Sequence, residues 1–283
     1  MRGTFRRPMA TTDPKFLESS PISLTDALME GLKQRIQHVQ DYALLSLQSI
    51  TNLFRPPYYL SDVLDQMDII GVGSLPIVVL TGFFIGAVMV LQTAAQFVRF
   101  GQTALTADAV SLALVRELGP TITGLLVAGR NASGIASELG SMVVTEQVDA
   151  MRAMGTDPTR KLVTPRVIAT VLMLPLLTAM ADFSGLIGGF IVSSFTLRLG
   201  AIAFWTRAIK ILVFSDLMQG LSKPLIFGFI LSTVGCYQGL RVRGGTQGVG
   251  RATTQAVVAS SVFILVANFF LTKVMLFLAG HVF

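Results

Sequence analysis

The chain has 283 residues, of which 52% are hydrophobic and 13% are charged, and its formal net charge is +6. Soluble globular proteins carry about 25% charged residues, so this composition excludes an ordinary soluble enzyme and indicates a protein with several membrane spans. The single Cys236 excludes an intrachain disulfide. Basic residues in so apolar a chain indicate the cytoplasmic side of a membrane rather than a nucleic-acid site.

The N-terminal part of the chain divides into two regions. Residues 1–20 contain three arginines but no apolar stretch, which predicts a flexible cytoplasmic tail and no signal peptide. In residues 21–57, apolar side chains recur every three or four positions from residue 24 to residue 54, which predicts an amphipathic helix that Pro56 and Pro57 end. Since no soluble core is available to this helix, we expect it to lie in the membrane interface.

Residues 58–283 contain five stretches that satisfy the requirement for a membrane span, about 20 mostly apolar residues. The second stretch is the least hydrophobic, because it contains Arg116, Glu117 and Arg130. The sequence therefore predicts an all-α, polytopic membrane protein in which an interfacial helix precedes five transmembrane helices. The expected spans are residues 69–98, 105–137, 167–197, 224–240 and 256–279, with a short amphipathic segment at 203–217.

The basic residues of the connections predict the orientation of these spans. If the N-terminus is cytoplasmic, the inner segments contain 14 Lys and Arg residues and the outer segments contain five, among them Lys223. The N-terminus is therefore expected inside and the C-terminus outside.

The second span contains the most informative polar residues. Arg116 and Glu117 are adjacent, hence about 100° apart around a helix, and they precede Gly119 and Pro120, where we expect a kink. Because ionisable groups at membrane depth are costly, they face a partner or a water-filled cavity. One interpretation is that both residues line a cavity for a charged headgroup, and the alternative is a structural ion pair with another span. We favour the cavity.

Other ionisable residues in the spans carry less information. Arg130 and Glu138 lie two helical turns apart on roughly one face, which indicates a structural or gating role. Asp182 and Lys273 cannot be distinguished from structural residues. The chain contains no G-x-x-x-x-G-K-[ST] loop and nothing that indicates an active site or a metal centre.

The connection at residues 140–165 is the second informative region. It carries Glu146, Gln147, Asp149 and Arg152, and the apolar residues of 143–154 fall on one side of a helix. This pattern predicts a short helix that docks on another protein, with a solvated loop as the alternative.

Six short motifs then occur in one collinear order. The segment of residues 55–279 that contains them resembles the MlaE/YrbE family of ABC-transporter permeases. The motifs are RELGP at 116–120, AGR at 128–130, ELG at 138–140, TEQ at 145–147, PLLT at 175–178 and GRATT at 250–254.

The resemblance implies a permease of a bacterial inner membrane, with a cytoplasmic N-terminus and a periplasmic C-terminus. Such a permease moves phospholipids between that membrane and an MCE-protein channel, which maintains outer-membrane lipid asymmetry. The implied partners are a second copy of the chain, an ABC ATPase subunit, a STAS-domain protein and a hexameric MCE-domain protein. No cofactor is expected on the chain itself, because the ATPase subunit binds the ATP.

The resemblance also implies roles for individual residues. Arg116 and Glu117 would line the substrate cavity. Residues 138–154 would supply the coupling helix that contacts the ATPase, through Glu138, Glu146, Gln147, Asp149 and Arg152.

Three alternatives remain open from the sequence. A permease of the same family could import sterols or fatty acids, or lipids into a plastid. A secondary transporter could instead move protons through Glu117, Asp182 and Lys273, although an odd number of spans disfavours a simple inverted repeat. The third alternative is a passive scaffold for the MCE assembly.

Overall fold

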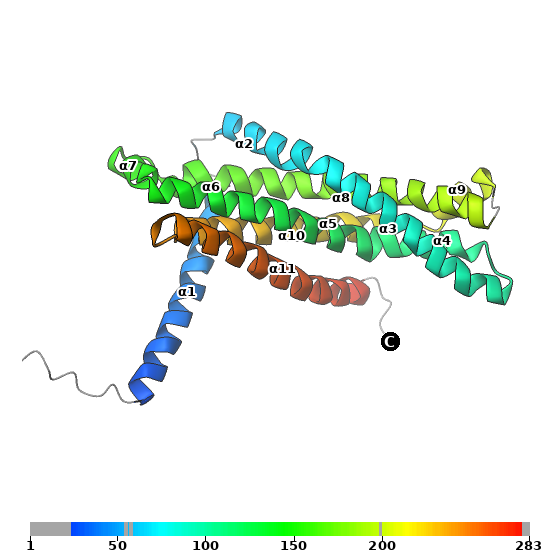
Figure 1. Cartoon of the computed structure of the whole chain (residues 1–283), viewed down its shortest axis with the longest axis horizontal. Helices are drawn as coiled ribbons and strands as arrows, with labels where there is room; N and C mark the ends of the chain where they lie inside the picture. Colours follow the sequence, from blue (N-terminus) through cyan, green and yellow to red (C-terminus); the bar gives the residue numbers. More distant parts are fainter. Residues whose placement is uncertain (1–23, 54–55, 57–58, 198–199, 279–283) are drawn as a thin grey trace, which may run out of the picture. The chain divides into compact units, whose positions relative to one another are not determined.

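A computed structural model describes residues 24–53, 56, 59–197 and 200–278, and within these ranges the chain forms helices and connections without a strand. The all-α class is thereby confirmed, whereas the tail predicted at residues 1–20 lies outside the described residues. Residues 1–43 and 44–283 form separate compact units. The α-helices (Figure 1) are α1 (Leu24–Leu53), α2 (Leu60–Met67), α3 (Gly73–Phe97), α4 (Leu105–Ala113), α5 (Gly119–Val127), α6 (Ser133–Val144), α7 (Gln147–Ala153), α8 (Thr164–Thr196), α9 (Ala201–Lys210), α10 (Phe214–Leu240) and α11 (Gly245–Leu278).

The predicted N-terminal amphipathic helix is present as α1. It ends at Leu53, before Pro56, as the sequence indicates. Several of its apolar side chains, among them Ile36, Val39 and Leu47, are exposed. The helix is therefore confirmed, while its location in a membrane interface stays a prediction.

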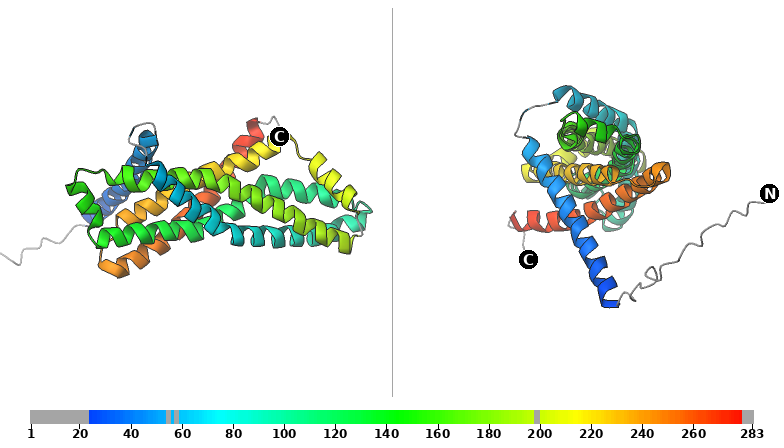
Figure 2. Two further views of the ribbon diagram at one scale, coloured as in Figure 1. Left: turned by 90° about the horizontal axis from the view of Figure 1, so that it is seen from above. Right: turned by 90° about the vertical axis from the view of Figure 1, so that its left-hand side faces the viewer.

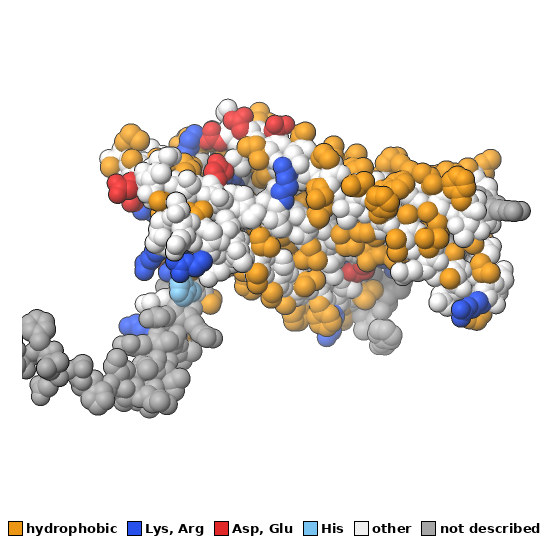
Figure 3. Space-filling view, viewed as in Figure 1, with side chains coloured by type: hydrophobic (Ala, Val, Ile, Leu, Met, Phe, Trp, Pro, Cys, Tyr) orange, Lys and Arg blue, Asp and Glu red, His pale blue; other side chains and the backbone are white. Residues whose placement is uncertain are grey.

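Five segments of the described chain are long and apolar enough to cross a membrane, which confirms the predicted number of spans. In Figures 1 and 2 these segments lie lengthwise beside one another as a bundle. Figure 3 shows charged side chains gathered around α2 and α7, and hydrophobic side chains covering the surface along α3 and α8. The segments are Leu60–Phe100, Leu105–Val144, Thr159–Thr196, Phe214–Leu240 and Gly245–Leu278.

The closest packing in the bundle joins α3 to α8. A Cβ atom on Gly86 would overlap the carbonyl oxygen of Gly185, and one on Gly82 would overlap the carbonyl oxygen of Ala181. Glycine at these positions lets two helix backbones touch, which is a common basis of helix association in membranes. Buried apolar side chains then connect this pair to the remaining helices: Val78, Val127, Leu174, Leu177, Phe227, Leu231 and Ile264.

The fourth span differs from the prediction. It begins at Phe214 and carries Pro224 inside the helix, so Lys223 belongs to a span and not to an outer connection. The amphipathic segment expected at residues 203–217 is correspondingly divided between α9 and the first turn of α10. The early start has a local cause, because the carboxylate of Asp216 accepts a hydrogen bond from the Val213 backbone N–H at 3.0 Å and caps the helix.

Two π-helical turns interrupt the second span. The first, η4 (Leu114–Leu118), ends directly before Gly119, and the second, η5 (Ala128–Ala132), contains Arg130. Single π-helical turns of this kind are frequent at functional sites. The irregularity of the helix thus occurs beside the expected Gly119–Pro120 position.

Candidate functional site

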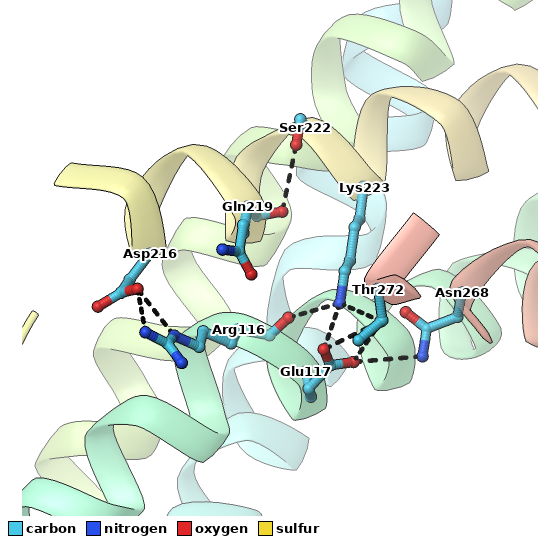
Figure 4. Close-up of polar contacts among 8 residues, drawn as sticks. All are labelled: Arg116, Glu117, Asp216, Gln219, Ser222, Lys223, Asn268 and Thr272. Carbon is cyan, nitrogen blue, oxygen red and sulfur yellow. Dashed lines mark hydrogen bonds and ion pairs between the residues drawn. The ribbon is translucent and has the colours of Figure 1, made fainter. Parts of the chain in front are cut away.

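Arg116 and Glu117 lie in the π-helical turn η4, and their side chains leave the helix in different directions (Figure 4). Each side chain is partly exposed, 36% for Arg116 and 39% for Glu117, and each forms an ion pair with a residue of α10. The two residues are therefore not paired with one another. Instead they connect the second span to the fourth at two points.

The first point is the contact between Arg116 and Asp216. The Nε atom of Arg116 donates to Oδ1 of Asp216 at 2.8 Å. The side chain of Asp216 is 1% exposed, and its other oxygen caps α10. Because the carboxylate is almost fully desolvated, the guanidinium is required to balance its charge.

The second point is Lys223, whose side chain is fully buried. An ammonium group has three N–H donors, and all three have acceptors here (Figure 4): Oε1 of Glu117 at 2.6 Å, Oγ1 of Thr272 at 2.9 Å and the backbone carbonyl of Arg116 at 2.9 Å. Pro120 explains the last contact. It has no N–H to donate to the carbonyl four residues earlier, which is that of Arg116, and Lys223 supplies the missing donor.

Glu117 also contacts the last span. The Thr272 hydroxyl donates to its carboxylate at 3.0 Å, and the Asn268 side-chain amide donates at 3.4 Å. A single carboxylate thus links the second, fourth and fifth spans. We call Arg116, Glu117, Asp216, Lys223, Asn268 and Thr272 the polar network.

An open apolar groove of about 480 Å³ lies between α3 and the second span. Leu118, which follows Glu117 in the chain, contributes to its wall from the second span, whereas Glu117 itself contacts α10 and α11. The other lining residues are Leu80, Thr81, Phe84, Ile85, Val88, Met89 and Gln92. An apolar groove on the span that carries two partly exposed, opposite charges matches the two parts of a lipid, acyl chain and headgroup.

The residues predicted to contact an ATPase lie at the other end of the bundle, around α7 (Figure 1). Glu138 pairs with the buried Arg166 of α8 at 2.7 Å. Asp149 and Arg152 pair with one another on the exposed surface of α7, and Glu146 and Gln147 are exposed beside them. The predicted site residues thus form two separate groups.

The short helix expected over residues 143–154 covers only part of that stretch. Val144 ends α6, and α7 begins at Gln147. Between them Glu146 has a φ of 59°, the left-handed conformation that L-residues rarely adopt. Val148 is buried and Met151 packs in the same apolar cluster, whereas Met154 is exposed.

Several polar residues were not identified from the sequence. Lys223 was placed in a connection, and Asp216, Asn268 and Thr272 were not singled out. One signal was available, since Asn268 and Thr272 are four residues apart and hence on one face of an otherwise apolar span. Asp182 is buried against Gly119, and within the described residues its Oδ1 atom has no hydrogen-bond partner. Lys273 is exposed on α11.

Sequence comparisons cover both groups of residues. The family described as Permease MlaE matches residues 63–274. A probable ABC transporter permease protein of Rickettsia typhi is 44% identical over 239 residues, 84% of this chain and 92% of that protein. The chloroplastic TRIGALACTOSYLDIACYLGLYCEROL 1 protein of Arabidopsis thaliana is 36% identical over 80% of this chain and 65% of its own length. The intermembrane phospholipid transport system permease protein MlaE of Haemophilus influenzae is 34% identical over 74% of this chain and 81% of its own length.

Proposed function

Because the chain belongs to the MlaE permease family, we propose that it is the membrane subunit of an ATP-driven phospholipid transporter. It moves phospholipids between a bacterial inner membrane and a channel formed by an MCE-domain protein, and so maintains outer-membrane lipid asymmetry. The observation that carries this proposal is the apolar groove of about 480 Å³ whose wall includes Leu118, the residue that follows Glu117.

The two parts of this site suit the two parts of a phospholipid. The groove holds an acyl chain, because its wall consists almost entirely of apolar side chains. Arg116 and Glu117 contact the headgroup, since both remain partly exposed after pairing with α10. The guanidinium suits a phosphate. Headgroup binding would explain why two ionisable residues are present within a span, where their insertion is energetically unfavourable.

ATP is bound by a partner subunit, because the chain has no P-loop motif of its own. The coupling region lies in α7 and the end of α6. Its exposed residues Glu146, Gln147, Asp149 and Arg152 contact the ATPase, and Glu138 supports them through Arg166. A STAS-domain protein completes the cytoplasmic side.

The permease is a homodimer and is capped on the periplasmic side by the hexameric MCE-domain protein. The exposure of α11 supports the dimer, since 6% of its most apolar stretch is buried within the described chain. The N-terminus is cytoplasmic and the C-terminus periplasmic, as the distribution of basic residues predicts. The exposed apolar residues of α1 support a location of that helix in the membrane interface.

Purification of the tagged chain from its native membrane in mild detergent, followed by mass spectrometry of proteins and lipids, tests this proposal. We expect an ATPase, an MCE-domain protein and bound phospholipid to co-purify. Arg116→Ala and Glu117→Ala are expected to reduce the retained phospholipid, whereas Arg99→Ala, at an exposed site outside the network, is not.

Other outcomes would change the assignment. Sterol or fatty acid in place of phospholipid would indicate an importing permease. A chain that purifies alone and without lipid would contradict the proposal and favour a secondary transporter. Unaltered lipid occupancy in both network variants would return Arg116 and Glu117 to a structural role.

A further inference from the structure

Arg130 is an exposed cation at the point where the second span contacts the first turn of α3. It lies in the π-helical turn η5, and its Nη1 atom donates to the Ser74 hydroxyl at 2.7 Å. Its guanidinium lies against Gly73, where a Cβ atom would overlap both terminal nitrogens. A side chain that is exposed and yet fixed by a hydrogen bond and a backbone contact presents its remaining donors in a defined direction.

The charge of Arg130 has no acidic partner among the described side chains. Two other arginines of the spans do have such partners: Arg166 pairs with Glu138, and Arg116 pairs with Asp216. An exposed guanidinium beside a lipid-facing surface attracts anionic headgroups.

Arg130 lies close to the charged end of the first span. The exposed Asp68 is the last acidic residue before the apolar run of α3, and Ser74 follows it by about 9 Å along a helix. The neighbouring acidic and basic side chains of α2 and α7 gather at this same end (Figure 3). In the orientation proposed above, this level is the headgroup region of the cytoplasmic leaflet.

A stripe of exposed apolar residues connects Arg130 to the groove. Gly73, Ile77, Leu80 and Phe84 follow one another at helical spacing on one face of α3, and the last three are 46%, 59% and 58% exposed. From Gly73 to Phe84 the stripe covers about 16 Å, close to half the hydrocarbon thickness of a bilayer, ~15 Å. Leu80 and Phe84 belong to both the stripe and the groove.

We propose that Arg130 and Ser74 bind the phosphate of a phospholipid in the cytoplasmic leaflet, whose acyl chain lies along the stripe toward the groove. Arginine suits a phosphate, since its N–H groups form charge-assisted hydrogen bonds with the oxygens. The site is thus a second lipid position, separate from the polar network. The inference rests on the proposed function for the orientation of the chain and for the class of ligand.

The test uses the complete transporter in vesicles of phosphatidylethanolamine and phosphatidylglycerol. The vesicles contain a trace of phosphatidylethanolamine with a photoreactive acyl chain or, in parallel, diacylglycerol with the same chain. After illumination, peptide mass spectrometry measures the label on residues 73–84. We expect the phospholipid to label this segment more than diacylglycerol does, and Arg130→Gln to lower the phospholipid label about tenfold.

Further variants separate the charge from the fold. Arg130→Lys keeps the charge and is expected to retain more label than Arg130→Gln. Ser74→Ala removes the hydrogen bond that positions the guanidinium and should give an intermediate value. Arg99→Gln is the matched control. Arg99 is exposed at the far end of the first span, which contains Ser74 and the labelled segment, and its substitution should leave the label unchanged.

Four results would overturn the inference. Equal labelling of the wild type and Arg130→Gln, or equal labelling by both lipids, would show that the phosphate is not recognised there. Suppression of the label by a millimolar excess of inorganic phosphate would assign the site to the free anion. Absence of any lipid label on residues 73–84 would mean that a protein helix covers the stripe.

The label on the groove residues 85–92 tests the proposed function separately from the second lipid site. If Arg130→Gln does not change the label on residues 73–84, the second lipid site is rejected. If residues 85–92 are still labelled in that experiment, the proposed permease function stands. Absence of label throughout the groove in the wild type would contradict the proposed function itself.

Discussion

At the scale of single residues, the charged side chains of the polar network form ion pairs and hydrogen bonds that join three spans. A lysine without exposed surface is tolerated in the bundle because each of its three donors has an acceptor. One of those acceptors exists because Pro120 leaves the Arg116 carbonyl free. The network thus depends on a backbone irregularity as much as on charge.

Lys223→Met is expected to destabilise the chain by about 1–3 kcal/mol, since it leaves the partly exposed Glu117 without its cation. Thermal unfolding of the purified protein in detergent measures the effect. Adding Glu117→Gln to Lys223→Met should restore part of the loss, because the remaining group is neutral. Lys210→Met changes an exposed lysine and serves as control. Equal melting temperatures for the two lysine variants would contradict the buried ion pair.

At the scale of elements, two features connect the spans to a possible motion. The glycines of α3 and α8 bring two long helices into backbone contact. The second span contains two π-helical turns and a proline, and it is followed directly by α7. A helix that has such turns and also ends in the proposed coupling region can transmit a change from one end of the bundle to the other.

Gly86→Ala is expected to lower the stability of the bundle by roughly 1–3 kcal/mol, because the added methyl group meets the backbone of α8. The matched control is Gly134→Ala, where a Cβ atom meets nothing within 4 Å and helix propensity improves. Thermal unfolding of both variants in detergent measures the difference in stability. If Gly86→Ala is as stable as Gly134→Ala, the close contact between α3 and α8 is not required.

Glu146→Lys is expected to uncouple the ATPase, because the reversed charge lies on the surface proposed to contact it. Lipid transport and ATP hydrolysis by the complete transporter in vesicles measure the coupling. Glu146→Gly is the comparison variant: it relieves the strain of a φ of 59° and removes the charge without reversing it, so it should uncouple less than Glu146→Lys. Unchanged lipid transport in Glu146→Lys would count against the docking role.

At the scale of the whole molecule, the two groups of residues lie at different levels of one bundle of spans. Helix α7 is at one end of the bundle and α4 and α9 are at the other (Figure 1), while the polar network joins η4, α10 and α11 between these ends. In the proposed orientation α7 faces the cytoplasm, and the network lies nearer the periplasm. This separation suits a permease in which ATP is hydrolysed on one side of the membrane and lipid is handled near the other.

The orientation can be measured with the chain's own cysteine as reference. Cys236 is the only cysteine and is buried, so the wild-type protein should not react with a membrane-impermeant maleimide. In intact cells whose outer membrane has been permeabilised, Lys210→Cys should be labelled, whereas Arg152→Cys should react only after the inner membrane is disrupted. The opposite pattern would reverse the proposed topology.

The sequence by itself determined the class of protein, the number of spans and the family, and it singled out Arg116 and Glu117 as polar residues within a span. Hydrophobic content and helical spacing are local properties, so α1 and the five spans could be recognised without tertiary structure. The Gly119–Pro120 position was informative for the same reason, since proline acts on its own helix.

Only the tertiary structure decided which side chains complete the site. Lys223 and Glu117 are 106 residues apart in the chain, and Thr272 is 155 residues from Glu117. Local hydropathy placed Lys223 in a connection because a lysine is unfavourable in a span until its acceptors are known. The division between α6 and α7 was hidden likewise, because a left-handed Glu146 has no sequence signature comparable to glycine. The partners of buried charges come from distant segments of the chain, so a local sequence pattern cannot identify them.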